Sequence, residues 1–128
     1  MNVKEYLLLK NKNICTISLN SANLNNFLEE LTSKINSGFN FFVVSFSELD
    51  DATAFAILKS ARQIVAEYDA LFIVSGRADF AYSLKADGVY LDKSHLEFNN
   101  FKEIFSENFI LASSTNSGIL ADIYIDWY

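Results

Sequence analysis

The stretch that decides the fold is ALFIVSGRADFAYSLKADGVYLDKSHL, residues 70–96. Its apolar run at 71–75 predicts a buried strand, residues 77–84 predict a short helix, and 88–91 predict a second strand. Polar residues follow each strand, in the positions where an α/β protein presents a site. These residues are Ser75, Gly76, Arg77, Asp92, Lys93 and His95. The set is chemically mixed, so it does not by itself indicate a reaction.

Four more apolar runs predict strands elsewhere in the chain. They lie at residues 13–19, 39–46, 109–114 and 123–127. The run at 39–46 is near-continuous, which is typical of a strand covered on both faces of a parallel sheet. Together with the two strands of the central stretch, they make about six predicted strands.

Apolar stripes at helical spacing lie between these strands. The first stripe consists of Leu24, Phe27, Leu28, Leu31 and Ile35, and the second of Ala54, Leu58, Ala61, Val65 and Tyr68. Asn and Ser residues before the first stripe, and Asp50 or Asp51 before the second, are predicted N-caps, and Gly38 is a predicted stop. A further helix is predicted at 98–106. Strands alternating with helices form βα units, either in an open doubly wound sheet or in part of a (β/α) barrel.

Composition limits the class of protein. At 128 residues with 51% apolar and 20% charged residues, the chain is expected to be one globular domain over 1–128. No apolar run approaches the roughly 18–20 residues of a membrane span, and the N-terminus lacks the pattern of a signal peptide, so a cytoplasmic protein is expected. The net charge of −6 and the scattered basic residues disfavour nucleic-acid and membrane surfaces. Cys15, the single cysteine, is expected to be buried and structural.

The central stretch carries a resemblance to a known family. ADGVYL (86–91), preceded by VSGRADFAYSLK (74–85), resembles the thiamin phosphate synthase family and its thiazole tautomerase branch. In that family a strand ends in Asn-Asp-Arg, a short helix follows, and Ala-Asp-Gly-Val-His-Leu-Gly-Gln comes next. LASSTNS (111–117) is similar to the family's Gly-x-Ser-x-His-Ser segment. The resemblance implies a truncated, about six-stranded TIM-barrel-like fold, with an open flavodoxin-like sheet as the alternative.

The resemblance also implies a reaction. Family members join a pyrimidine pyrophosphate to a thiazole phosphate with magnesium, and the tautomerase branch isomerises a thiazole carboxylate with a histidine. This sequence departs from the family at most of the chemical positions. The pyrophosphate-binding Arg and Lys fall on Ser45 and Ser47, the two magnesium-binding Asp residues on Gly76 and His95, and the tautomerase histidine on Asn116. Glycine offers magnesium no oxygen ligand and asparagine transfers no proton near neutral pH, so no metal, no cofactor and no identified catalytic residue are expected.

Five residues remain as candidate contacts to an anion. Arg77 matches its family position and is expected to clamp a phosphate or carboxylate, unless it pairs with Asp79 at the helix start. Lys93 either supplies further positive charge or is a solvated loop residue, and His95 is expected to be a loop histidine rather than a metal ligand. The other candidates are Ser113, Ser114 and Thr115, which either cradle an anion at a helix start or form an N-cap and a turn.

Two functions compete on this basis. The first is a non-catalytic or binding-only relative of the thiamin biosynthesis enzymes, with a small phosphorylated ligand as its partner. The second is an active, divergent synthase or tautomerase, which the lost side chains disfavour. Homo-oligomerisation is expected because the ending IYIDWY (123–128) is apolar or aromatic on both faces of a strand.

Overall fold

The computed structural model describes residues 13–91, 110–116 and 119–127, the last two ranges through their backbone. It has four parallel strands alternating with helices, as the sequence predicted. The chain forms two compact units, Met1–Phe72 and Ile73–Tyr128. Their boundary lies inside strand β3 (Leu71–Ser75) and not in a linker. The expectation of one domain over 1–128 stays a prediction.

The sheet of the first unit is a parallel pair of strands. β1 (Ile14–Leu19) pairs with β2 (Phe41–Phe46), in a register that runs from Ile14 opposite Phe41 to Leu19 opposite Phe46. Burial alternates along β1: Cys15, Ile17 and Leu19 are buried, whereas Thr16 and Ser18 on the other face are exposed. The first four residues of β2 are buried on both faces. This pattern agrees with the continuous apolar run that predicted β2.

Helix α2 (Phe27–Asn36) begins later than the apolar stripe predicted. The stripe started at Leu24, but the preceding turn is held by Asn20, whose Oδ1 accepts hydrogen bonds from the backbone N–H groups of Ala22 (2.9 Å) and Asn23 (3.1 Å). Asparagine side chains compete with helical hydrogen bonding in this way, which delays the helix. The predicted stop at Gly38 is confirmed by its φ of 103°, a conformation that favours glycine.

Helix α3 (Asp51–Glu67) follows β2 and is capped as the sequence predicted. The Asp50 carboxylate accepts a hydrogen bond of 3.1 Å from the Thr53 N–H, and hydrogen bonds from Thr53 lower the pKa of Asp50. The buried residues of helix α3 are Ala54, Leu58, Ala61 and Val65. The prediction that Tyr68 continues this stripe is wrong, because the helix ends at Glu67, Asp69 takes a positive φ of 56°, and Tyr68 is 51% exposed.

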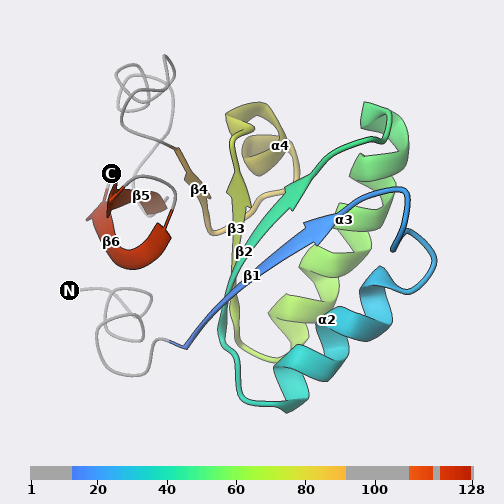
Figure 1. The fold of residues 1–128 in the computed structure, drawn as a ribbon, viewed down its shortest axis with the longest axis horizontal. Coiled ribbons are helices and arrows are strands. Elements are labelled where there is room, and N and C mark those ends of the chain that lie inside the picture. The colour runs from blue at the N-terminus through green and yellow to red at the C-terminus, as the bar shows by residue number, and fades with distance from the viewer. Residues whose placement is uncertain (1–12, 92–109, 117–118, 128) are drawn as a thin grey trace. The chain divides into compact units, whose positions relative to one another are not determined.

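Helices α2 and α3 lie side by side on one face of the β1–β2 pair (Figure 1). This arrangement accounts for the alternating burial of β1, since one set of its side chains faces the helices and the other does not. Among the described helices, none combines the length and the apolar character needed to cross a membrane.

The second unit begins within β3 and continues through α4 (Ala78–Ser83) to β4 (Gly88–Tyr90). β3 and β4 are parallel, with Ile73 opposite Gly88. Helix α4 buries the predicted residues Phe80 and Ala81 and contacts β4. The central stretch therefore folds as the strand, short helix and strand that the sequence predicted.

Strand direction changes at the end of the second unit. β5 (Ile110–Asn116) is parallel to β4, whereas β6 (Ile119–Trp127) is antiparallel to β5. The prediction of parallel βα units is therefore wrong for the last strand. The reason is the connection: residues 117–118 alone separate β5 from β6, and a parallel pair needs a crossover of about a dozen residues or more. The predicted helix at 98–106 lies outside the described residues.

We predict that Leu58→Ala lowers the free energy of unfolding by about 2–5 kcal/mol, because Leu58 is fully buried and its truncation leaves a cavity. Lys59→Ala, one position along the same helix on its exposed side, is the matched control and is expected to change it by about 0.5 kcal/mol or less. Urea denaturation measures both. A loss for Leu58→Ala no larger than for Lys59→Ala would show that α3 does not pack through this stripe.

Candidate functional site

The carboxyl ends of parallel strands are where an α/β sheet places its ligands. At this end of β1 and β2, Ser18 lies opposite Ser45, and their Oγ atoms form a hydrogen bond of 2.9 Å. Ser18 lies on the face of β1 that the helices leave exposed, and Ser45 of β2 is partly buried. The structure thus puts two neutral hydroxyls, bonded to each other, at the place where the family resemblance implied a cationic grip on pyrophosphate.

The loops after β1 and β2 are tied together by polar groups. Asn23 Nδ2 donates to the Ser18 carbonyl oxygen at 2.6 Å, and the Asn20 N–H donates to Asn23 Oδ1 at 2.8 Å. Ser21 Oγ donates to Glu48 Oε2 across the two loops at 3.4 Å. The charged side chains of residues 18–26 and 45–51 are all acidic: Glu48, Asp50 and Asp51. This end of the first unit therefore disfavours an anion electrostatically.

The candidate residues predicted from the sequence did not include Asn20 and Asn23, which form this hydrogen-bond network. The signal that points to it is the spacing of the two asparagines in NSAN, residues 20–23, since asparagine side chains bond to nearby backbone groups in turns. The contact between Ser21 and Glu48 has no such local signal, because it joins two loops that are distant in sequence.

In the second unit, Gly76 follows β3 with a φ of 76°, and its N–H donates to the Tyr90 carbonyl oxygen at 2.9 Å. The hydrogen bond fastens the end of β3 to the end of β4. Gly76 has no side chain to offer a metal, although a carboxylate is expected here from the resemblance. Among residues 13–91, no three His, Cys, Asp or Glu side chains come together as a metal site. The side chains described in this range therefore do not form a magnesium site.

Arg77 is held by its neighbours along the chain. Its Nε donates to Asp79 Oδ1 at 3.0 Å and its Nη2 to Asp79 Oδ2 at 2.9 Å, which is a bidentate ion pair. Its guanidinium carbon lies 4.4 Å from the centre of the Phe80 ring, and Phe80 is buried. The hydrogen bonds from Arg77 lower the pKa of the Asp79 carboxyl. Of the two expectations for Arg77, the pairing with Asp79 is the one that the structure shows.

Of the other candidate contacts, only Ser113, Ser114 and Thr115 lie within the described residues. Lys93 and His95 lie outside the described residues. Ser113, Ser114 and Thr115 are part of strand β5, where Ser113 pairs with Tyr124 and Ser114 with Ile123. The expected helix start or turn at 113–115 is therefore wrong, because ladder pairing with β6 holds this segment extended.

Cys15 is buried in β1, as expected. Burial raises the pKa of its thiol, which keeps the sulfur protonated near neutral pH. A protonated, buried thiol is a packing residue and not a nucleophile.

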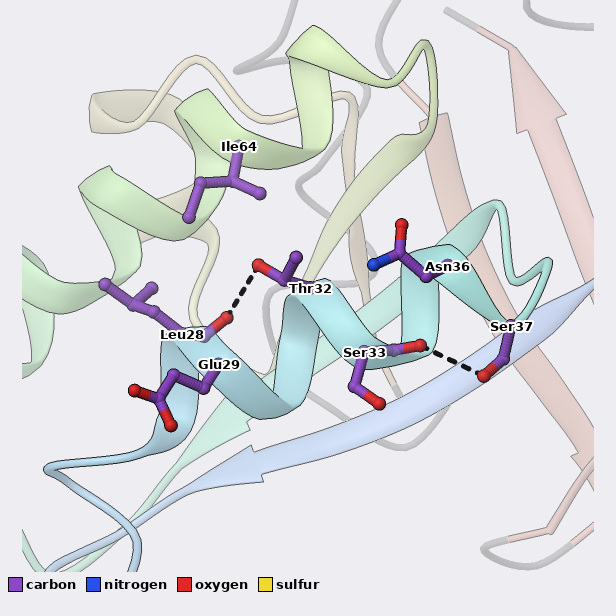
Figure 2. A pocket seen from close by; sticks show the side chains of 7 residues that line it. All are labelled: Leu28, Glu29, Thr32, Ser33, Asn36, Ser37 and Ile64. Atoms are coloured by element: carbon purple, nitrogen blue, oxygen red, sulfur yellow. Dashed lines mark hydrogen bonds between the residues drawn. The ribbon is translucent and has the colours of Figure 1, made fainter.

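A groove of about 580 Å³ lies on the helical side of the first unit, between α2 and α3 (Figure 2). Its lining residues are Leu28, Glu29, Thr32, Ser33, Asn36, Ser37 and Ile64. Two of its hydroxyls bond to their own helix, Thr32 to the Leu28 carbonyl oxygen (2.9 Å) and Ser37 to that of Ser33 (3.0 Å). These two hydroxyls are used in local structure, whereas Glu29, Ser33 and Asn36 are the other polar side chains of the lining.

We predict that Asp79→Asn lowers the thermal midpoint at pH 7 by a small amount, because both partners of the pair are partly exposed. The folded-state pKa of Asp79 lies below its ordinary value of 3.8, so the stabilisation is present above that pH and is lost as the pH falls through the folded-state pKa. The difference between variant and parent should therefore shrink between about pH 5 and pH 2. Melting curves over this range measure it, and a difference that stays constant would exclude the ion pair as its cause.

The family model and the individual proteins that are similar to this chain carry descriptions of the same kind. The family model described as thiamine monophosphate synthase matches residues 14–122. The thiamine-phosphate synthase of Rhodopirellula baltica is 31% identical over 83 residues, which are 65% of this chain and 22% of that protein. The thiamine-phosphate synthase of Pyrococcus furiosus is 41% identical over 63 residues, which are 49% of this chain and 30% of that protein.

The fold is shared with a solved structure, a thiamine phosphate pyrophosphorylase from Pyrococcus furiosus, at a TM-score of 0.67 and 28% identity. The match covers 80% of this chain and 50% of that one. The chain spans half or less of the length of each of these relatives. The family model covers most of the chain, including both strand pairs whose ends are described above, and the chain therefore belongs to the thiamine monophosphate synthase family.

Proposed function

We propose that this chain is a thiamin phosphate synthase-like, binding-only member of its family, related to thiamin biosynthesis in the cytoplasm, that binds a small phosphorylated ligand without catalysis. The observation that carries the proposal is the Ser18–Ser45 hydroxyl pair, which stands where a cationic grip on pyrophosphate is implied. A truncated TIM-barrel-like arrangement of the parallel strands, followed by the antiparallel β6, is part of the same proposal and is supported by the structural likeness to the Pyrococcus furiosus protein.

The absence of catalysis follows from the charges that the reaction needs. A leaving pyrophosphate develops negative charge, which enzymes stabilise with Arg, Lys or magnesium. The described loops after β1 and β2 supply hydroxyls, asparagines and carboxylates instead. Gly76 supplies no ligand for a metal that could replace the missing cations. Each of these changes removes transition-state stabilisation, and the carboxylates oppose it.

The proposed ligand contacts centre on Arg77, with Lys93 and Ser113, Ser114 and Thr115 as further candidates. Arg77 is about one-third exposed at the end of β3. A single arginine is sufficient to bind a phosphate group weakly, because a charge-assisted hydrogen bond contributes about 1.5–3 kcal/mol. Binding without turnover is therefore the function that the charges support best.

An active, divergent synthase or tautomerase is the alternative. It is favoured by the identity of 31% to the Rhodopirellula baltica thiamine-phosphate synthase. An active enzyme would need cationic and proton-transferring side chains from parts of the chain other than the described carboxyl ends of β1, β2 and β3.

The test is an assay with the pyrimidine pyrophosphate and the thiazole phosphate, with and without magnesium, beside an active family enzyme as the positive control. We expect no turnover above background from this chain. The double variant Ser45→Arg/Ser47→Lys restores two implied cations and should bind pyrophosphate about tenfold or more tightly than the parent in calorimetry. Magnesium-dependent turnover by the parent chain, abolished by EDTA, would replace this proposal with the enzymatic alternative.

We also propose that the chain forms a homodimer or a higher oligomer. Among the described strands, β1 pairs only with β2, carries no charged residue, and leaves Thr16 and Ser18 exposed. An uncharged edge strand is a surface that natural proteins cover or pair.

Light scattering at micromolar concentration tests this proposal. We expect a mass of at least twice 14.5 kDa. Thr16→Lys places a charge on the edge and should shift the mass towards one chain, whereas Tyr82→Lys, on an exposed position of the second unit, should not. A mass of one chain for the parent would contradict an oligomer.

A further inference from the structure

The contact between Arg77 and Asp79 has a consequence for any anion at the end of β3. The carboxylate takes the edge of the guanidinium that carries Nε and Nη2, with both hydrogen bonds at 2.9–3.0 Å. A phosphate group binds arginine through the same kind of parallel, two-bond contact. Asp79 therefore occupies a position that the oxygens of a phosphate would take.

The pair is also electrically neutral as a whole. An anion that approached another part of the guanidinium would lie within a few ångströms of the Asp79 carboxylate, and the repulsion would offset most of the attraction to Arg77. Since the pKa of Asp79 is lowered by these hydrogen bonds, the carboxylate keeps its charge throughout the physiological range.

The Phe80 ring restricts the movement that would relieve this competition. The guanidinium carbon lies 4.4 Å from the ring centre, and the ring is fixed by burial in the second unit. Stacking on an immobile ring keeps the arginine side chain beside Asp79, which is the residue directly before Phe80 in sequence. A ligand therefore has to displace the carboxylate, because the arginine is not positioned to swing away from it.

We propose that Asp79 is an internal competitor for anions at Arg77, so that the Arg77–Asp79 pair lowers the affinity of this position for a phosphate group. The proposal rests on the proposed function, in which Arg77 contacts a phosphorylated ligand. It makes Asp79 a residue that tunes binding through Arg77 and does not itself contact the ligand.

The test is calorimetric titration of the whole chain with inorganic pyrophosphate and with inorganic phosphate. We expect Asp79→Asn to bind pyrophosphate about fivefold more tightly than the parent, which corresponds to the upper range for a partly exposed ion pair. Asp79→Ala is the second variant, because it removes the acceptor oxygens as well as the charge. The gain should shrink as salt is raised from about 0.05 to 0.5 M, since both groups are accessible to solvent.

Two controls separate this effect from a general loss of negative charge. Asp69→Asn removes the same charge in the turn that precedes β3, whereas Arg77 follows that strand in sequence, and it should leave the affinity unchanged. Asn is compatible with the positive φ of position 69. The double variant Arg77→Ala/Asp79→Asn should lose the gain. Circular dichroism confirms that each variant is folded.

The outcomes distinguish the inference from the function on which it rests. If Arg77→Ala weakens binding tenfold or more but neither Asp79 variant strengthens it, the competition is wrong and the role of Arg77 stands. If Arg77→Ala changes nothing and the Asp79 variants gain nothing, both are wrong. A gain in pyrophosphate affinity that persists in the Arg77→Ala/Asp79→Asn variant overturns the inference. The inference is also wrong if neither the parent nor the Asp79 variants bind pyrophosphate. Binding that appears only in the Asp79 variants and needs Arg77 supports it.

Discussion

The parallel pairing of β1 with β2 is the constraint on which the first unit depends. Parallel strands need a crossover between them, and the crossover here carries α2, while α3 follows β2 on the same face. The register of the pair then fixes which side chains meet at the carboxyl ends. It puts Ser18 opposite Ser45, whose hydroxyl groups form a hydrogen bond with each other. The chemistry of this end therefore follows from a backbone register rather than from any single loop.

Charge separates the scaffold of this protein from the reaction associated with its family. The scaffold needs apolar strands and helix stripes, and these are retained along β1 to β4. The reaction needs cations, and the described loops after β1 and β2 carry carboxylates and hydroxyls instead. A fold can keep its packing while its site changes charge, because strand-end side chains contribute little to the core. This independence is why family membership and a binding-only role are compatible here.

The pair of Arg77 and Asp79 illustrates how a retained residue can change its role. The sequence identifies Arg77 by its position after β3, and the structure shows how its hydrogen bonds are used. Phe80 stacks against the guanidinium, so Asp79 and Phe80 in the first turn of helix α4 both hold the arginine. A motif therefore marks where a charged group lies, whereas the neighbouring carboxylate decides how much of that charge a ligand experiences.

The sequence by itself determined the elements whose signals are local: the buried strands, the cap at Asp50, the stop at Gly38 and the short helix around Phe80. Periodicity and capping act within a few residues, so they can be read along the chain. Only the tertiary structure decided the exposure of Tyr68, the antiparallel direction of β6, and the contacts of Ser18 with Ser45 and of Ser21 with Glu48. These features depend on where a helix ends, on what pairs with a strand, and on register between segments 27 residues apart in sequence. The contacts between distant segments have no local pattern, because they arise from packing between elements, whereas the direction of β6 follows from its two-residue connection to β5.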